Sequence, residues 1–267
     1  MNEIIIPALS IGAIGLVLGA LLALASKIFY VEVNEKAVEI SEILPGANCG
    51  ACGFAGCSAY AQAVAEGKAK PNCCCPGGQA TADSIAQIMG MQSEKVEEKK
   101  AVILCSGEDG ITNNKYNYVG EMDCIIASKL QGGGAKDCTY GCLGYGSCIK
   151  VCRNNAISII NGIASVDEDK CGGCGECASV CPKKVIDIIP KKNKIYVKCK
   201  SCDKGAIVKN KCSIGCIGCK ICEKNCPEGA ITVTDNCASI DYSKCTECGL
   251  CVEKCPKKII VDGGTNA

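Results

Sequence analysis

The cysteines of this chain are closely spaced, and their spacing indicates what they bind. The 267 residues contain 28 Cys and no His. Most of these cysteines lie two or three residues from the next one. That is too close on tight loops for disulfide geometry, but it suits thiolates arranged around a metal centre. Because there is no His, haem–His, Rieske and mixed Cys/His zinc sites are excluded. Iron–sulfur clusters are expected, with zinc held by four thiolates as the alternative.

Two runs near the C-terminus have the pattern Cys-x2-Cys-x2-Cys-x3-Cys-Pro, beginning at Cys216 and at Cys245. In bacterial two-cluster ferredoxins, the first three Cys of such a run bind one [4Fe–4S] cluster and the fourth ligates the other cluster. The two predicted ligand sets are therefore Cys216, Cys219, Cys222 and Cys255, and Cys245, Cys248, Cys251 and Cys226.

An earlier region repeats this arrangement with one departure. Eight cysteines recur 74 positions later without a gap, as Cys138 does at Cys212 (212 − 138). The first run of this copy has Tyr145 at the position of Cys219, so we expect the upstream Cys138 to supply the missing thiolate. The alternatives are a lost cluster or a three-iron form. The predicted sets are Cys138, Cys142, Cys148 and Cys181, and Cys171, Cys174, Cys177 and Cys152.

A further group near the N-terminus has the spacing Cys-x2-Cys-x4-Cys-x16-Cys and is followed by a Pro-Gly-Gly tail. The glycines between its first cysteines let the backbone approach a cluster and direct amides at its sulfides. Spacing alone does not decide which of Cys73, Cys74 and Cys75 is the fourth ligand. We assign the set as Cys49, Cys52, Cys57 and Cys74.

Eight cysteines remain outside these five sets. They are Cys73, Cys75, Cys105, Cys124, Cys199, Cys202, Cys212 and Cys237. Further clusters that use Cys199, Cys202 and Cys212 are an open alternative, because Cys199-x2-Cys202 has ligand spacing but no evident fourth ligand. Otherwise these thiols are structural. No catalytic residue is expected, since no Gly-rich dinucleotide loop follows a strand in this chain.

The elements that hold these cysteines follow from local pattern. Ser58–Glu66 is expected to be a helix that ends at Gly67 and returns the chain to Cys74. A short apolar strand is expected at Ala101–Leu104. Each copy of the repeat should contain a hairpin after its first run. Its turn is Asn161-Gly162, of type I′, in the first copy and Asp235-Asn236 in the second.

The first thirty residues are expected to anchor the chain in a membrane. Positions 4 to 26 carry no charge and are long enough to span the bilayer as a helix. A cleaved signal peptide is the alternative, but the basic n-region is missing. Gly15-x-x-x-Gly19 suits close packing against a partner helix. Because thiolate-ligated clusters need a reducing compartment, we expect the rest of the chain on the cytoplasmic side of the cell (inner) membrane.

We therefore predict an α+β chain with a single N-terminal transmembrane helix, a small Cys-rich [4Fe–4S] domain and two tandem ferredoxin-like domains. The predicted divisions are an anchor (1–30), an N-terminal [4Fe–4S] domain (31–90), a connecting segment (91–135), a first ferredoxin-like domain (136–190), a Lys-rich connector (191–211) and a second ferredoxin-like domain (212–267).

The net charge of +1 gives no general attraction to nucleic acid. Residues 183–211, however, contain ten Lys and two Asp. This patch could steer an acidic ferredoxin, or it could be an ordinary solvated surface.

The order of these parts resembles the RnfB family, the electron-input iron–sulfur subunits of the Rnf complex. The resemblance covers nearly the whole chain and rests on the anchor, the N-terminal Cys group with its Pro-Gly-Gly tail, and the ferredoxin runs. It implies an electron-relay subunit of an ion-translocating ferredoxin:NAD+ oxidoreductase, which is a translocase. Such a protein would pass electrons from soluble ferredoxin, through five [4Fe–4S] clusters, to membrane, flavin and NAD-reducing subunits. The alternative is a membrane-tethered polyferredoxin that serves a redox sensor or another membrane oxidoreductase.

Overall fold

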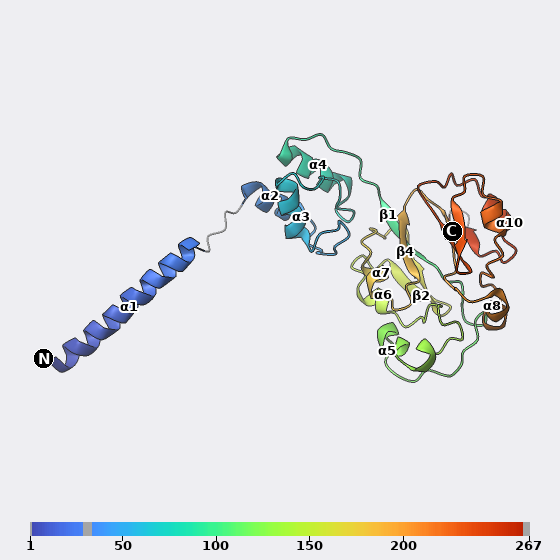
Figure 1. Cartoon of the computed structure of the whole chain (residues 1–267), viewed down its shortest axis with the longest axis horizontal. Helices are drawn as coiled ribbons and strands as arrows, with labels where there is room; N and C mark the ends of the chain where they lie inside the picture. The colour runs from blue at the N-terminus through green and yellow to red at the C-terminus, as the bar shows by residue number, and fades with distance from the viewer. Residues whose placement is uncertain (1, 29–33, 264–267) are drawn as a thin grey trace.

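The computed structural model describes residues 2–28 and 34–263, with the side chains of residues 12–27 and 34–263 (Figure 1). Helix α1 (Asn2–Ile28) covers most of the predicted anchor. Within the described part of the chain, no helix has both the length and the apolar character needed to cross a membrane. A helix is therefore confirmed at this place, whereas the membrane span over residues 1–30 stays a prediction, of which residues 1, 29 and 30 lie outside the described residues.

Three helices form the N-terminal unit. They are α2 (Glu35–Ile43), α3 (Cys57–Ala65) and α4 (Gly78–Met89). Their apolar faces share a core that includes Ile40, Tyr60, Val64 and Ile85. Helix α3 confirms the helix expected over Ser58–Glu66. It stops there because Gly67 adopts a left-handed conformation, with φ of 71°.

The strands of the described residues form four two-stranded antiparallel sheets. The pairs are β1 (Lys99–Ile103) with β4 (Ile186–Pro190), β2 (Ile157–Ile160) with β3 (Ile163–Val166), β5 (Ile195–Val197) with β8 (Ile260–Asp262), and β6 (Ile231–Thr234) with β7 (Cys237–Ile240). Each copy of the repeat thus contains one local hairpin. Each also contains a second strand pair, β1–β4 or β5–β8, that joins the start of the copy to its end. The strand expected at Ala101–Leu104 is confirmed as β1.

Both predicted hairpin turns are confirmed by their backbone conformations. Asn161 and Gly162 have φ of 49° and 73°, and Asp235 and Asn236 have φ of 50° and 60°. Two consecutive residues with positive φ are what a type I′ turn requires. The turns fix the register of β2–β3 and β6–β7, and therefore the positions of the cysteine runs on either side.

Short helices carry or follow the cysteine runs. They are α5 (Cys124–Ser128), η1 (Gln131–Gly133), α6 (Ser147–Lys150), α7 (Glu176–Val180), α8 (Gly205–Lys211), α9 (Ile221–Lys224) and α10 (Leu250–Lys254). The two cores beside them combine Ile and Val with cysteine side chains. The chain has only two Phe and no Trp. Thiols therefore occupy interior space that large aromatic side chains fill in other small domains, and this mixture of helices and strands agrees with the expected α+β class.

Candidate iron–sulfur sites

The thiols of the N-terminal group lie together. Burial raises the pKa of Cys74, and the negative charges of Cys57, Cys52 and Cys49 raise it further. Cys57 begins helix α3, and its backbone N–H donates to the Asn48 side chain at 2.8 Å. The electrostatic effect of Cys49, Cys52 and Cys57 on Cys74 indicates that the four cysteines that the sequence assigned to one set lie near one another.

Tyr60 fixes the loop that carries the fourth thiol of this group. Its hydroxyl donates to the Lys70 carbonyl at 2.7 Å and accepts from the Cys73 N–H at 3.2 Å. Burial raises the pKa of Tyr60 far above its ordinary value, so the hydroxyl keeps its proton and can donate. In this arrangement Cys74 is buried in the helical core, whereas Cys73 and Cys75 are only partly buried. The structure therefore favours Cys74 among the three adjacent cysteines.

The second copy of the repeat brings its cysteines together as two crossed sets. Burial raises the pKa of Cys222 to about 11, with further increases from Cys216, Cys219 and Cys255. Burial likewise raises the pKa of Cys251 to about 11, with further increases from Cys245, Cys248 and Cys226. In each case the fourth thiol comes from the other run, as the two-cluster ferredoxin pattern requires.

One set of the first copy shows the same crossing. Burial raises the pKa of Cys177 to about 12, and the charges of Cys174, Cys171 and Cys152 raise it further. The N–H of Ala101, on strand β1, donates to the Cys171 sulfur at 3.4 Å. Strand β1 therefore belongs physically to this copy, although it lies outside the predicted 136–190 region.

The other set of the first copy differs from the expectation. Burial raises the pKa of Cys148 to about 12, and the thiols that raise it further are Cys142, Cys124, Cys181 and Cys177. Cys124 was among the unassigned cysteines. Cys138, the predicted substitute for the missing ligand, instead has its pKa raised by burial and by Cys105 and Cys212. The structure thus brings Cys124 to the Tyr145 run and places Cys138 in another group of thiols.

Helix α5 positions Cys124. The Asp123 carboxylate caps this helix by accepting from the N–H groups of Ile125 and Ile126 at 2.8 and 3.3 Å. It also forms a 2.9 Å ion pair with Lys150 on α6. The hydrogen bond with Lys150 is the main cause that lowers the pKa of Asp123 to about 2, so the carboxylate is ionised at neutral pH. The cap therefore attaches the start of α5, where Cys124 lies, to the helix that carries Cys148.

Tyr145 lies beside Cys124, the cysteine that replaces the thiol missing at position 145. The backbone N–H of Cys124 donates to Ser147 Oγ at 2.7 Å. Cys124 and Leu143 are buried in one small cluster, against which Tyr145 and Tyr118 pack. The rings of Tyr118 and Tyr145 stack with centroids 4.8 Å apart. The ring of Tyr145 therefore packs at the position where the complete run has a cysteine. Helix α5, which precedes this run in the sequence, places the thiol of Cys124 beside it.

Backbone N–H groups point at several of these sulfurs. Donors lie 3.3 to 3.5 Å from the sulfurs of Cys57, Cys152, Cys171 and Cys226. Hydrogen bonds to the sulfurs are one of the means by which proteins set the potentials of iron–sulfur clusters. The thiol sets and their N–H donors fit [4Fe–4S] clusters. Among the described residues, no three cysteine or carboxylate side chains are close enough together to hold a single metal ion.

The Lys-rich patch is partly neutralised within the chain. Lys191 and Lys192 pair with Glu98 and Glu97 at 3.4 and 3.1 Å, and Lys211 pairs with Asp203 at 2.9 Å. Lys200, Lys204 and Lys209 are exposed. The positive surface that remains is therefore smaller than the sequence count of ten Lys against two Asp implies.

Three family models match the cysteine regions. An Fe-S cluster model matches residues 44–76, a 4Fe-4S binding domain matches residues 164–187, and a 4Fe-4S dicluster domain matches residues 215–259. The dicluster match falls on the second copy, whose two runs are complete. The match within the first copy covers only its complete second run, consistent with the departure at Tyr145.

Curated relatives match this chain almost from end to end. The B subunit of the Na(+)-translocating ferredoxin:NAD(+) oxidoreductase complex of Acetobacterium woodii is 42% identical over 97% of this chain and 78% of the relative. The B subunit of an ion-translocating oxidoreductase complex of Methanosarcina acetivorans is 42% identical over 97% and 99%. The B subunit of the proton-translocating ferredoxin:NAD(+) oxidoreductase complex of Clostridium ljungdahlii is 42% identical over 98% and 95%. With this identity over most of both chains, the protein belongs to the RnfB family of ion-translocating oxidoreductase complexes.

Proposed function

We propose that this chain is the electron-relay subunit of an ion-translocating ferredoxin:NAD+ oxidoreductase. It would accept low-potential electrons from soluble ferredoxin and pass them, one at a time, to partner subunits in the membrane. The observation that carries the proposal is the set of five groups of four thiols, each placed by crossed cysteine runs or by the N-terminal helices. A [4Fe–4S] cluster supplies one-electron redox chemistry without bond-making on a substrate.

We assign one cluster to each group. In the first copy, Cys124 takes the place predicted for Cys138. The five ligand sets are Cys49, Cys52, Cys57 and Cys74; Cys124, Cys142, Cys148 and Cys181; Cys171, Cys174, Cys177 and Cys152; Cys216, Cys219, Cys222 and Cys255; and Cys245, Cys248, Cys251 and Cys226. These thiols would hold the clusters, and backbone N–H groups point at the sulfurs of Cys57, Cys152, Cys171 and Cys226 in three of the five sets.

Helix α1 would attach the chain to the membrane beside its partner subunits, with the cluster domains on the cytoplasmic side. The uncharged stretch in positions 4 to 26 and the Gly15-x-x-x-Gly19 spacing support this placement. The reducing cytoplasm would keep the many free thiols available for cluster assembly. Membrane fractionation of the full chain, with alkaline carbonate extraction, tests the attachment, and release by carbonate would exclude a spanning helix.

The function is tested on the full chain, isolated from membranes without oxygen. Reduced ferredoxin should bleach the cluster absorbance and give reduced [4Fe–4S] signals in electron paramagnetic resonance. The chain should also co-purify with several membrane and flavin-containing subunits. Rapid reduction by ferredoxin without any such partner would favour a tethered polyferredoxin. Zinc without acid-labile sulfide would exclude electron relay altogether.

A further inference from the structure

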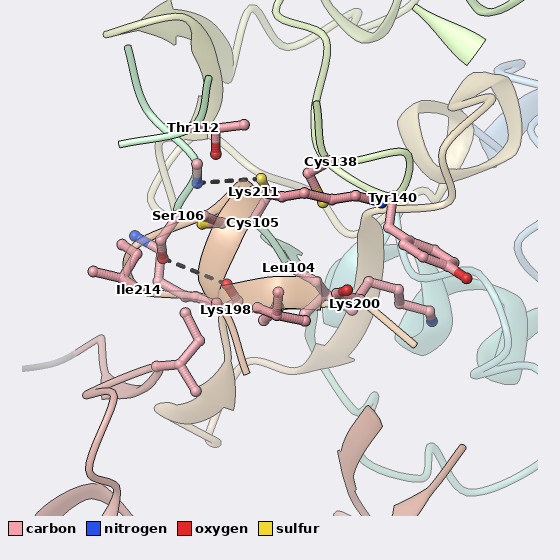
Figure 2. A pocket seen from close by; sticks show the side chains of 18 of the residues that line it. Leu104, Cys105, Ser106, Thr112, Cys138, Tyr140, Lys198, Lys200, Lys211 and Ile214 are labelled. Carbon is pink, nitrogen blue, oxygen red and sulfur yellow. Dashed lines mark hydrogen bonds between the residues drawn. The ribbon is translucent and has the colours of Figure 1, made fainter. Parts of the chain in front are cut away.

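A pocket outside the five assigned groups is lined by four cysteines, Cys105, Cys138, Cys199 and Cys212. It encloses about 490 Å³, including its mouth. Figure 2 shows Cys105 and Cys138 at this pocket, with Thr112, Tyr140 and Lys211 among the neighbouring side chains. The four cysteines come from both copies of the repeat, which lie side by side in Figure 1. None of the four belongs to a ligand set given under Proposed function, where Cys124 replaces Cys138 in the set of the Tyr145 run.

Two of these cysteines occupy equivalent places in the two copies. Cys105 follows strand β1 by two residues, and Cys199 follows strand β5 by two residues. The pair meets directly in an antiparallel β-bridge. The N–H of Cys142 donates to the Cys105 sulfur at 3.3 Å, and the N–H of Cys216 donates to the Cys199 sulfur at the same distance. Each copy therefore supplies one sulfur in the same hydrogen-bonded setting.

The other two cysteines are also equivalent. Cys138 and Cys212 are partners in the internal repeat, since their positions differ by 74 (212 − 138). Each precedes a glycine by three residues. A Cβ atom placed on Gly141 would lie 3.7 Å from the Cys138 sulfur, and one placed on Gly215 would lie 3.7 Å from the Cys212 sulfur. The pocket is thus made of two matching halves, each with two thiols.

The four thiols line one pocket, with Cys105 buried and Cys138, Cys199 and Cys212 partly buried. Burial raises the pKa of Cys199 to about 12, and the charges of Cys216 and Cys138 raise it further. Cys138 in turn has its pKa raised by burial and then by Cys105 and Cys212. Four thiols that line one pocket suit a [4Fe–4S] cluster, which is held by four cysteine ligands.

Two polar groups at the pocket point to an anionic occupant. Lys136 is 6% exposed, and its ammonium donates to the carbonyls of Gly107 and Gly162 at 2.7 and 2.9 Å. No carboxylate pairs with Lys136 within residues 34–263. Buried charges are normally paired, and a [4Fe–4S] cluster with four thiolates carries net negative charge. The buried hydroxyl of Thr112 lacks a hydrogen-bond partner among the described residues, so it is free to donate to a sulfur in the pocket.

We propose that Cys105, Cys138, Cys199 and Cys212 hold a sixth [4Fe–4S] cluster, which joins the two ferredoxin-like copies. The inference rests on the proposed function, because it assumes that the neighbouring groups hold clusters. Cys142 is a ligand of the first copy and Cys216 is a ligand of the second. Each reaches a thiol of the sixth site through a single N–H···S hydrogen bond. A cluster held by these four thiols would supply a one-electron relay between the first copy and the second.

The test measures iron and acid-labile sulfide in the full chain, purified with its clusters and without oxygen. Six cubanes give about 24 iron and 24 sulfide per chain, against about 20 of each for five. The variants Cys105→Ser and Cys199→Ser should each lose about four iron, or about one with a new three-iron signal in electron paramagnetic resonance. Cys237→Ser is the matched control, since Cys237 is a partly buried thiol of the same copy as Cys199 and should lose none.

A double variant separates this site from its neighbours. Cys105→Ser with Cys138→Ser should lose no more than about four iron in all, because both thiols ligate the same cluster. About 20 iron in the parent chain, with no loss in Cys105→Ser and Cys199→Ser, would overturn the sixth cluster and leave the proposed function intact. One zinc per chain that disappears in these variants would also overturn it. A parent chain without iron would instead refute the proposed function.

Discussion

The peptide N–H of Cys124 donates a 2.7 Å hydrogen bond to the hydroxyl of Ser147. Ser147 is the first residue of α6 and directly precedes Cys148. The bond therefore joins the start of one helix to the start of another, across 23 residues of sequence (147 − 124). It holds a thiol against a run in which Tyr145 occupies the expected ligand position.

Removing the thiol of Cys124 should cause the chain to lose one cluster. We expect Cys124→Ser to lose about four iron per chain, because the cluster keeps only three thiolate ligands. Adding Tyr145→Cys to the same chain should restore the iron, since position 145 corresponds to Cys219 of the complete run. Iron and sulfide analysis checks both variants. Full iron in Cys124→Ser would show that Cys124 is a structural thiol.

Cys124 and Cys138 should act on different clusters. The double variant Cys124→Ser with Cys138→Ser is expected to lose about eight iron, the sum of two separate losses. If Cys138 were instead the fourth ligand of the Tyr145 run, Cys138→Ser would account for the whole loss and Cys124→Ser would add nothing. The measurement is the iron content per chain of the two single variants and the double variant, all prepared in the same way.

The ion pair between the buried Lys100 on β1 and the partly exposed Glu168 should stabilise the first copy. Lys100 is 1% exposed, and its ammonium lies 2.5 Å from the Glu168 carboxylate. Glu168→Gln would leave the Lys100 charge without its counter-charge, which costs about 1–3 kcal/mol because the partly exposed Glu168 is screened by water, or roughly 2–12 °C in melting temperature. The check is the apparent melting temperature of the cluster-loaded chain at a fixed scan rate. Asp167→Asn, which removes an exposed pair with Lys170, is the control and should shift it little.

The cluster-free chain should become less stable at high pH. Burial raises the pKa of Cys222 and of Cys251 to about 11, above the ordinary value of 9. In the unfolded chain these thiols lose their protons first, so their contribution is complete below about pH 9 and is lost as the pH rises toward 11. Thermal unfolding of the cluster-free chain at pH 8 and pH 10.5 checks this. A melting temperature that does not fall would contradict the burial of these thiols.

The exposed lysines near α8 should speed the encounter with ferredoxin. Lys204→Glu with Lys209→Glu is expected to slow ferredoxin-driven reduction by roughly tenfold at low salt, because steering acts on the association rate. The difference should shrink as salt screens the charges. Stopped-flow reduction at two ionic strengths measures both effects. Lys36→Glu, on the N-terminal helix α2, is the matched control, and an equal slowing in that variant would exclude docking at α8.

Local signals predicted much of this fold. The type I′ hairpins, the helix that ends at Gly67 and the strand at Ala101–Leu104 follow from turn chemistry and short apolar patterns. The crossed placement of the complete runs follows from spacing that is fixed within each run. The pairing of β1 with β4 joins residues far apart in the sequence, and no local pattern encodes such a partner.

The placement of Cys124 and Cys105 escaped prediction for one shared reason. Cys105 and Cys138 are 33 positions apart (138 − 105), whereas Cys199 and Cys212 are 13 apart (212 − 199). The longer connection hides the equivalence of Cys105 and Cys199 from a search at a fixed interval of 74. It also contains α5, which supplies Cys124 beside Tyr145. A strand followed at its end by Cys, found in both copies, was the signal available in the sequence.

The matching halves of the pocket have a consequence for how such a protein could arise. A chain with one copy would present only two of the four thiols, at an open surface. Two such chains related by a two-fold axis would place four thiols around one centre, since a two-fold interface uses the same patch on both partners. The duplicated chain would correspond to such a dimer fused into one polypeptide, and assembly of the proposed shared site would not depend on protein concentration.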